Sequence, residues 1–194
     1  MDYKELYDKS MSYEEYEELF ERLFNEKRTT GKEQKESLIN YVQLNWQRNK
    51  RVKKKYIPSE DLIQRINSTQ KKSTIFVITE PWCGDSVFSL TPLGNIKETG
   101  ADIDVRVILR DQEEDVINNY LTNGSKSIPK MLVFKNEKEV ATWGPRPKAL
   151  LDFVQEYKSK EGFSKEELSK EIQLWYNKDK GEQVFSELEE MIKS

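Results

Sequence analysis

The stretch TIFVITEPWCGDS, residues 74–86, decides the fold of this chain. Its first six residues are apolar or β-branched, which is typical of a buried strand, and Glu80-Pro81 ends that strand. The pattern turns helical from Ser86 onward, so Cys83 is expected where the strand runs into a helix. A thiol in the first turn of a helix faces unpaired backbone N–H groups, which favour the thiolate. Because Ser86 stands where a Cys-x-x-Cys motif has its second cysteine, no disulfide can close within the chain.

The composition narrows the classes of function. The chain has 194 residues, a net charge of −3, one cysteine and no histidine. Catalysis by Ser/His or Cys/His pairs and His metal sites are therefore excluded, and we expect neither a metal nor a prosthetic group. The sequence shows neither a secretory signal nor an apolar run long enough to cross a bilayer. We therefore expect a cytoplasmic protein with no membrane partner.

A basic run from Arg48 to Lys55 has two interpretations. Clustered Lys and Arg side chains are the kind of patch that binds the phosphates of a nucleic acid. Cations at the C-terminal end of a solvated helix explain the same run without a ligand. The net negative charge favours the second interpretation, so we expect no nucleic-acid partner.

The middle of the chain alternates strands and helices. Such a β-α-β-α order is typical of a parallel sheet with crossover helices. Two more apolar runs follow and are joined by four residues, a connection short enough for an antiparallel hairpin. The expected elements are a strand over 73–79, a helix over about 86–98, a strand over 103–109, a helix capped by Asp111 with Glu114, strands over 131–134 and 140–143, and a helix that starts at Pro147.

Helical patterns flank this region on both sides. On the N-terminal side we expect a helix with a capping box at Ser12 and Glu15, a second helix from about Thr30 or Gly31, and a third capped by Ser59. On the C-terminal side, Ser164 with Glu167 caps one helix and Gly181 precedes another. The expected organisation is an N-terminal helical extension over 1–57, a central domain over 58–160, and C-terminal helices over 161–194 that pack on it.

Two motifs in this order resemble the thioredoxin superfamily. They are Trp82-Cys83-Gly84 at the start of a helix and Ser127-Ile128-Pro129-Lys130 before the hairpin. The resemblance covers roughly residues 58–160 and implies a thioredoxin-like α/β fold, with a mixed central sheet between helices. Trp-Cys-Gly-Asp together with the Trp-Gly-Pro-Arg-Pro segment at 143–147 is similar to a bacterial thioredoxin-like family with extra helices before the core.

The resemblance also implies roles for individual residues. Cys83 is the exposed nucleophile, and Pro129 is the cis-proline that faces it. A cis peptide there exposes the backbone of Ile128, which can pair with an extended substrate and hold its sulfur against Cys83. Ser86 can donate a hydrogen bond to the sulfur. The residues expected to position the substrate are Trp82, Gly84, Asp85, Ile128, Lys130 and Arg146.

Several positions depart from the thioredoxin pattern. Ser86 replaces the resolving cysteine, so an outside thiol must clear a mixed disulfide on Cys83. Val77 stands where many thioredoxins carry a buried acid. The carboxylate of Asp85 suits a helix N-terminus but opposes a nearby thiolate, and Lys130 offsets this effect if it lies close. Arg146 is either an ordinary exposed loop arginine or the partner of a carboxylate on a small thiol such as glutathione or bacillithiol.

Three hypotheses of function follow from this sequence. The first is monothiol thiol-disulfide exchange, in which Cys83 acts on protein disulfides or on mixed disulfides with low-molecular-weight thiols. The second is a non-catalytic binding module with Cys83 as a buried structural residue. The third is a dithiol oxidoreductase in which Ser86 stands for an original cysteine. The aromatic faces of the added helices either pack on the core or provide the contact of a homodimer.

Overall fold

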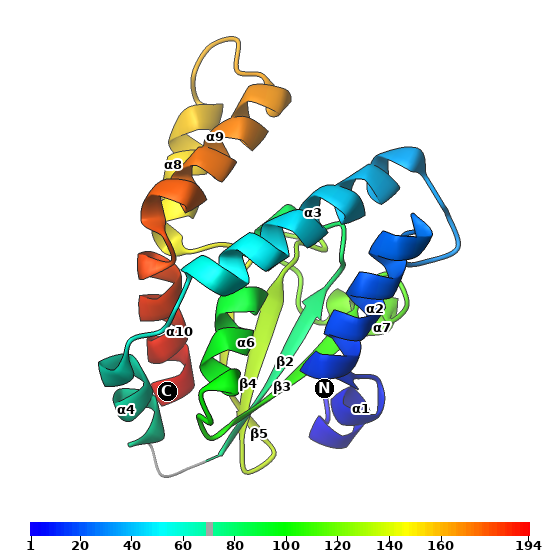
Figure 1. Cartoon of the computed structure of the whole chain (residues 1–194). Coiled ribbons are helices and arrows are strands. Elements are labelled where there is room, and N and C mark those ends of the chain that lie inside the picture. The colour runs from blue at the N-terminus through cyan, green and yellow to red at the C-terminus, as the bar shows by residue number, and fades with distance from the viewer. Residues whose placement is uncertain (69–71) are drawn as a thin grey trace.

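A five-stranded mixed sheet forms the centre of the molecule (Figure 1). The computed structural model describes residues 1–68 and 72–194. The strand order is β1-β3-β2-β4-β5, with β2 and β3 parallel and the other neighbours antiparallel. This arrangement confirms the expected β-α-β unit and the hairpin after it. The strands are β1 (Met11–Ser12), β2 (Ser73–Thr79), β3 (Ile103–Leu109), β4 (Lys130–Lys135) and β5 (Lys138–Trp143).

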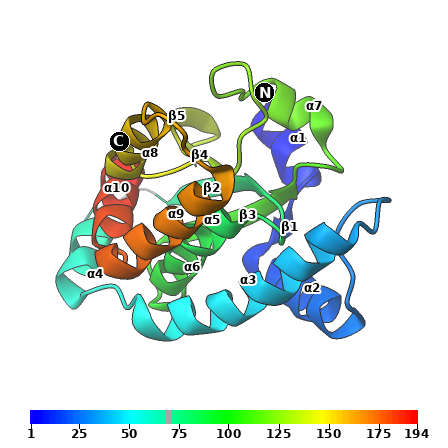
Figure 2. The same cartoon turned by 90° about the horizontal axis from the view of Figure 1, so that it is seen from above.

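Helices cover both faces of this sheet (Figure 2). The helices of the described residues are α1 (Tyr3–Asp8), α2 (Tyr13–Glu26), α3 (Glu36–Lys55), α4 (Glu60–Asn67), α5 (Gly84–Val87), α6 (Leu90–Glu98), α7 (Glu114–Asn118), α8 (Lys148–Lys158), α9 (Lys165–Asp179) and α10 (Glu182–Lys193). The sequence-based fold class, a thioredoxin-like mixed sheet with flanking helices, is confirmed.

Strand β2 is buried on both faces because alternate side chains enter two different cores. Ile75 and Val77 belong to the larger core, to which α2, α3, α4, α6, α8, α9 and α10 contribute. Phe76 and Ile78 point to a smaller core under α1 and α7. Cys83, just beyond the end of the strand, belongs to the smaller core.

The N-terminal segment differs from the sequence-based expectation in two ways. Its residues Met11 and Ser12 form β1, an edge strand that pairs with β3 and that the sequence did not indicate. The second helix begins at Glu36 rather than at about Thr30 or Gly31. The preceding loop is held by the side chain of Gln34, which hydrogen bonds to both backbone groups of Thr29. The capping box at Ser12 and the cap at Ser59 are confirmed.

Three expected helix starts in the central region were wrong in detail. The helix expected over 86–98 is two helices, α5 and α6, because the backbone of Ser89 leaves the helical conformation at φ −125°. Asp111 does not cap α7, because the N-cap is Glu113 and the Asp111 carboxylate accepts from Arg110 instead. Pro147 is the N-cap of α8 and not its first residue.

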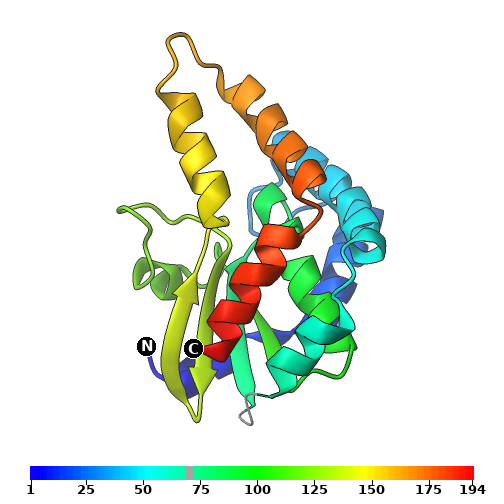
Figure 3. The same cartoon turned by 90° about the vertical axis from the view of Figure 1, so that its left-hand side faces the viewer.

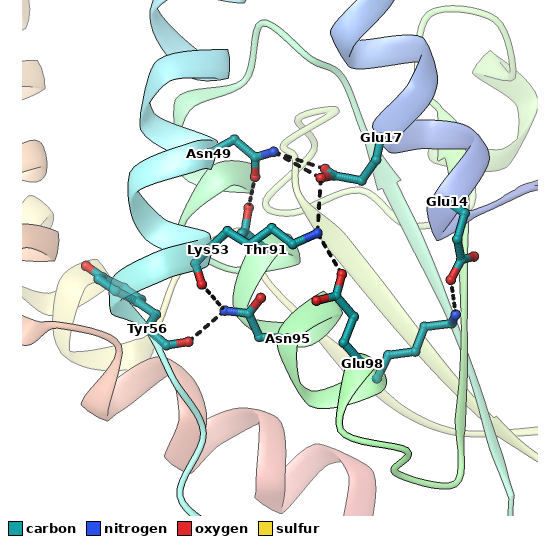
Figure 4. A network of polar contacts seen from close by, with 9 residues as sticks. Glu14, Glu17, Asn49, Lys53, Tyr56, Thr91, Asn95 and Glu98 are labelled. Atoms are coloured by element: carbon teal, nitrogen blue, oxygen red, sulfur yellow. Dashed lines mark hydrogen bonds and ion pairs between the residues drawn. The ribbon is translucent and has the colours of Figure 1, made fainter.

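A polar network fastens the N-terminal helices to the core (Figure 4). Asn49 of α3 donates to Glu17 of α2 at 3.1 Å and accepts from Thr91 of α6 at 2.5 Å. Lys53 lies 2.6 Å from Glu98 and 3.7 Å from Glu17. One cation of the basic run therefore turns toward the protein, where two carboxylates neutralise it.

Helices α8 and α9 form a hairpin that projects beyond the sheet, and α10 returns to pack against it (Figure 3). Ser164 accepts hydrogen bonds from Glu166 and Glu167 at the start of α9, and Gly181 precedes α10, as the sequence predicts. Buried Leu168, Ile172 and Tyr176 place one face of α9 on the larger core. The hairpin and α3 therefore stand on either side of the Cys83 end of the sheet (Figure 1).

Candidate functional site

Cys83 lies at the N-cap of α5, four residues after the end of β2. Its backbone N–H donates to the carbonyl of Glu80 at 2.9 Å, which closes the turn between strand and helix. The sulfur lies 3.5 Å from the carbonyl oxygen of Ile128, and the Ile128–Pro129 peptide bond is cis. The fold therefore brings together two motifs that are more than forty residues apart in the sequence.

The Cys83 thiol is buried, whereas the family resemblance implies an exposed nucleophile. Its exposed fraction is 7%. Burial raises the pKa of the thiol to about 11, and the charge of Asp85 adds to this rise. Hydrogen bonds from the Ser86 side chain and from the backbone of Ser86 and Asp85 act in the opposite direction. The helix position does favour the thiolate, as the sequence suggests, but desolvation is the larger effect.

Ser86 is buried one turn after Cys83, with 3% of its surface exposed. Its hydroxyl hydrogen bonds to the hydroxyl of Thr79 at the end of β2. Each hydroxyl has a single proton, so when Ser86 donates to the sulfur, Thr79 must donate to Ser86. The structure thus holds Ser86 beside the thiol, and in that arrangement Thr79 supplies the proton that Ser86 accepts.

Asp85 and Arg146 form an ion pair beside the thiol. The guanidinium donates to one carboxylate oxygen from Nε at 3.0 Å and from Nη2 at 2.7 Å. Tyr176 of α9 donates to the other oxygen at 3.1 Å, and its ring stacks on Phe88 at 4.3 Å. Neither interpretation of Arg146 from the sequence describes this position, because its guanidinium is bound to Asp85 and partly shielded from solvent.

Gly144 lets the segment that carries Arg146 approach the segment that carries Pro129. Its φ is +111°, and a Cβ at this position would lie 2.2 Å from the carbonyl oxygen of Pro129. Only a glycine lets the two backbones approach this closely. The Trp-Gly-Pro-Arg-Pro segment therefore places Arg146 by direct contact with the segment that carries Pro129.

Lys130 and Trp82 serve other contacts than the sequence suggests. The Lys130 ammonium donates to Thr122 at 2.7 Å and to the Gly144 carbonyl at 3.4 Å, so it is engaged away from the sulfur. Trp82 packs against both cores, and the Arg110 guanidinium lies 4.6 Å from the centre of its ring. Trp82 is therefore a packing residue between the two cores, next to Cys83 in the sequence.

Glu80 is a site residue that the sequence analysis missed. Its side chain is fully buried, accepts a hydrogen bond from the Thr30 hydroxyl, and accepts from the Asp111 backbone N–H at 2.8 Å. Burial raises its pKa to about 7, against the lowering effect of these two hydrogen bonds. The signal was present in the sequence, because Glu80 directly follows a run of apolar and β-branched residues that predicts a buried strand.

A pocket of about 650 Å³ opens beside Cys83. Residues of helices α3, α8 and α9 line it, together with Trp82, Cys83 and Gly84. The remaining lining residues are Leu38, Tyr41, Arg48, Asp85, Arg146, Val154, Lys158, Phe163, Lys165, Leu168, Ser169, Ile172 and Gln173. Helices from both sides of the central region therefore line the pocket through which a solute can approach the thiol.

Within the described residues, 1–68 and 72–194, no helix is both long and apolar enough to span a bilayer. The same residues contain no group of three or more Cys, Asp or Glu side chains arranged to hold a metal ion.

Comparisons with known proteins agree with this geometry. The chain matches a crystal structure of a protein of unknown function from Pseudomonas aeruginosa with a TM-score of 0.68 and 16% identity, over 100% of this chain and 98% of the other. It matches an HIV epitope scaffold with a TM-score of 0.64, 16% identity and the same coverage. None of the curated proteins compared with the chain matches it. A family model described as thioredoxin matches residues 31–158, and the chain therefore belongs to the thioredoxin family.

Proposed function

We propose that this protein performs monothiol thiol-disulfide exchange through Cys83. The observation that carries the proposal is the position of the sulfur. It lies 3.5 Å from the Ile128 carbonyl next to the cis Pro129, and it lines a pocket that is open to solutes. Within this proposal, the Trp-Cys-Gly-Asp motif defines a bacterial monothiol branch of the family that acts in the cytoplasm.

The proposed reaction needs one protein thiol and one outside thiol. The Cys83 thiolate attacks the small-thiol sulfur of a mixed disulfide, so that the Cys83 disulfide forms and the substrate protein leaves as a thiolate that takes up a proton. A second low-molecular-weight thiol then attacks this disulfide, releases Cys83 and leaves as a small-molecule disulfide. Ser86 stabilises the thiolate of Cys83 by hydrogen bonding in both steps.

The raised pKa of Cys83 sets the pH dependence of this activity. With a pKa of about 11, the thiolate fraction rises about tenfold for each pH unit from neutrality to pH 10. We therefore expect slow exchange at neutral pH and a steep increase in alkaline solution. A substrate that brings a hydrogen-bond donor to the sulfur stabilises the thiolate and raises the fraction that can attack.

The test is intact-mass analysis after incubation with oxidised small thiols between pH 7 and pH 10. We expect an adduct on the wild type whose rate follows the thiolate fraction, and none on Cys83→Ala. Absence of an adduct at pH 10 with every disulfide tried would sink the proposal. A slow alkylation rate that does not change with pH also contradicts it.

A non-catalytic binding module is the second candidate function. The observation in its favour is the burial of Cys83, which leaves 7% of the residue exposed. In that case the groove near Pro129 or the added helices recognise a partner or a second copy of the chain. The adduct experiment separates the two functions, because a binding module needs no chemistry at Cys83.

The dithiol hypothesis is tested by restoring a cysteine at position 86. Ser86→Cys places a second thiol one turn from Cys83, where oxidation can close a disulfide. If the ancestral site was a dithiol, this variant reduces insulin faster than the wild type. A variant that forms no intramolecular disulfide rejects this hypothesis.

A further inference from the structure

The pocket beside Cys83 carries an excess of positive charge. Arg48, Arg146, Lys158 and Lys165 line it, and Asp85 is the only carboxylate among the described lining residues. Arg146 and Tyr176 already occupy both oxygens of Asp85. The other three cations therefore face the pocket without a carboxylate from its own lining to neutralise them.

Arg48 of α3 reaches the segment that carries Cys83. Its Nη1 lies 3.5 Å from the position of a Cβ on Gly84, and the Nε2 of Gln173 from α9 lies 3.7 Å from the same point. Arg48 donates to the neutral Asn45 at 3.1 Å and forms no ion pair within the described residues. Two donors from different helices thus converge beside the residue that follows Cys83.

The surroundings of Arg48 favour an anionic ligand. The side chain is half-buried, and burial lowers its pKa although a guanidinium stays charged. Removing a charge from water is costly unless an opposite charge compensates. A carboxylate bound by Arg48 supplies that compensation, because a guanidinium matches its two oxygens with two parallel hydrogen bonds.

We propose that this pocket binds the carboxylate of a low-molecular-weight disulfide, with Arg48 and Gln173 as its donors and Cys83 facing its sulfur. This inference rests on the proposed function and specifies its substrate class. The volume of about 650 Å³ lies within the rough range of 300–1,000 Å³ for small-molecule sites. Leu168 and Ile172 supply apolar surface for the methylene groups between carboxylate and sulfur.

The exchange step balances without a further reactant. The Cys83 thiolate attacks one sulfur of the disulfide, the sulfur–sulfur bond of the ligand breaks, and a mixed disulfide forms on Cys83. The other half of the ligand leaves as a thiolate and takes up the proton that Cys83 gave to the solvent. One thiol and one disulfide are present before and after the step.

Binding is measured first, without chemistry, on Cys83→Ala by titration calorimetry. The probes are dithiodipropionate, which is anionic, bis(hydroxyethyl) disulfide, which is neutral, and cystamine, which is cationic. We expect dithiodipropionate to bind most tightly, and Arg48→Met to weaken that binding roughly tenfold or more, as for the loss of one hydrogen bond to a charged group. Lys54→Met is the matched control, because Lys54 is exposed on the same helix outside the pocket.

Gln173→Leu is a second variant on a different helix, which keeps the test decisive if Arg48→Met fails to fold. We expect it also to weaken dithiodipropionate binding, while Lys54→Met leaves it unchanged. Equal affinity for the anionic and neutral probes overturns the inference. So does Arg48-dependent binding of an acidic peptide in the absence of dithiodipropionate binding, since the site then serves a protein segment.

Exchange is measured second, on the chain with Cys83 present. We expect dithiodipropionate to form the Cys83 adduct faster than bis(hydroxyethyl) disulfide, and Arg48→Met to remove this preference. If no probe forms an adduct but the anionic probe still binds through Arg48, the proposed function fails and the carboxylate site stands. If all probes form adducts at rates independent of Arg48, the carboxylate site fails and the exchange function stands.

Discussion

Two carboxyl groups flank Cys83 in the sequence, and they differ in their binding partners and in their burial. Asp85, on the side of the C-terminal helices, is bound by the Arg146 guanidinium and by the Tyr176 hydroxyl. Glu80, on the side of the N-terminal loop, is more deeply buried and is bound only by the Thr30 hydroxyl and a backbone N–H. One carboxyl therefore has a cation as its partner, and the other has neutral donors.

The difference shows how the added segments set the electrostatics of the cysteine. Asp85 acts on Cys83 as a negative charge and raises the pKa of the thiol. Glu80 has a pKa of about 7 because burial without a bound cation favours its neutral form. The same kind of side chain thus has a cationic partner on one side, and on the other side it is a buried group with a raised pKa.

The largest effect is expected for Glu80→Gln. The pKa of Glu80 is 4.5 for a free side chain and about 7 in the folded chain, so the folded state holds its proton more tightly. The contribution of this group to stability is complete below about pH 4.5 and is lost as the pH rises through 7. The difference of 2.5 units corresponds to about 3 kcal/mol of unfolding free energy.

The glutamine of this variant reproduces the protonated acid, because its amide can donate to Thr30 while its oxygen accepts from Asp111. We therefore expect the difference in unfolding free energy between variant and wild type to grow by about 3 kcal/mol in favour of the variant as the pH rises from 4.5 to 9. Urea unfolding at several pH values measures this difference. Glu18→Gln, on the exposed face of α2, is the control. A stability difference that stays constant with pH would show that Glu80 is not the titrating group.

Arg146→Met removes the cation from the other side of the comparison. Asp85 then keeps only the Tyr176 hydrogen bond, and its partly buried charge is left without a counter-ion. We expect a loss of roughly 2 kcal/mol in unfolding free energy, the range for a hydrogen bond to a charged group. Adding Asp85→Asn should restore part of the loss. Equal losses in the single and double variants contradict the pairing.

Tyr176→Phe removes the neutral donor from Asp85 and keeps the stacking on Phe88. We expect a loss of roughly 1 kcal/mol, because the ion pair with Arg146 remains. Tyr157→Phe on α8 is the matched control, and thermal unfolding is the measurement. A loss larger than that of Arg146→Met would mean that the tyrosine, rather than the cation, holds the carboxylate.

Asp85→Asn tests the same ion pair through the reactivity of Cys83 rather than through stability. Removing this negative charge lowers the pKa of Cys83, because the Asp85 charge is the second cause of its rise after burial. Iodoacetamide alkylation at a fixed pH between 8 and 10 should therefore be faster than in the wild type. Unchanged kinetics would mean that burial alone sets the thiol pKa.

Most of the fold was predictable because its signals are local. The apolar run of β2, the alternation along β3 and the cap at Ser164 depend on neighbouring residues, and each lies where the sequence indicates. Strand β1 was not predictable, because two residues carry no periodic pattern and only pairing with β3 makes them a strand. The break at Ser89, by contrast, carried a local signal that was missed, because Pro92 has no N–H to donate to the carbonyl of Phe88 four residues earlier.

The sequence by itself determined the thioredoxin-like order of elements, the lone thiol at the start of a helix and the absence of a second cysteine. Only the tertiary structure decided the state of that thiol. Burial raised its pKa, Arg146 was drawn to Asp85, and Glu80 was enclosed with Thr30. Helices and strands follow from the spacing of apolar side chains, which is a property of neighbouring residues. Desolvation and charge pairing depend on segments that meet only after folding.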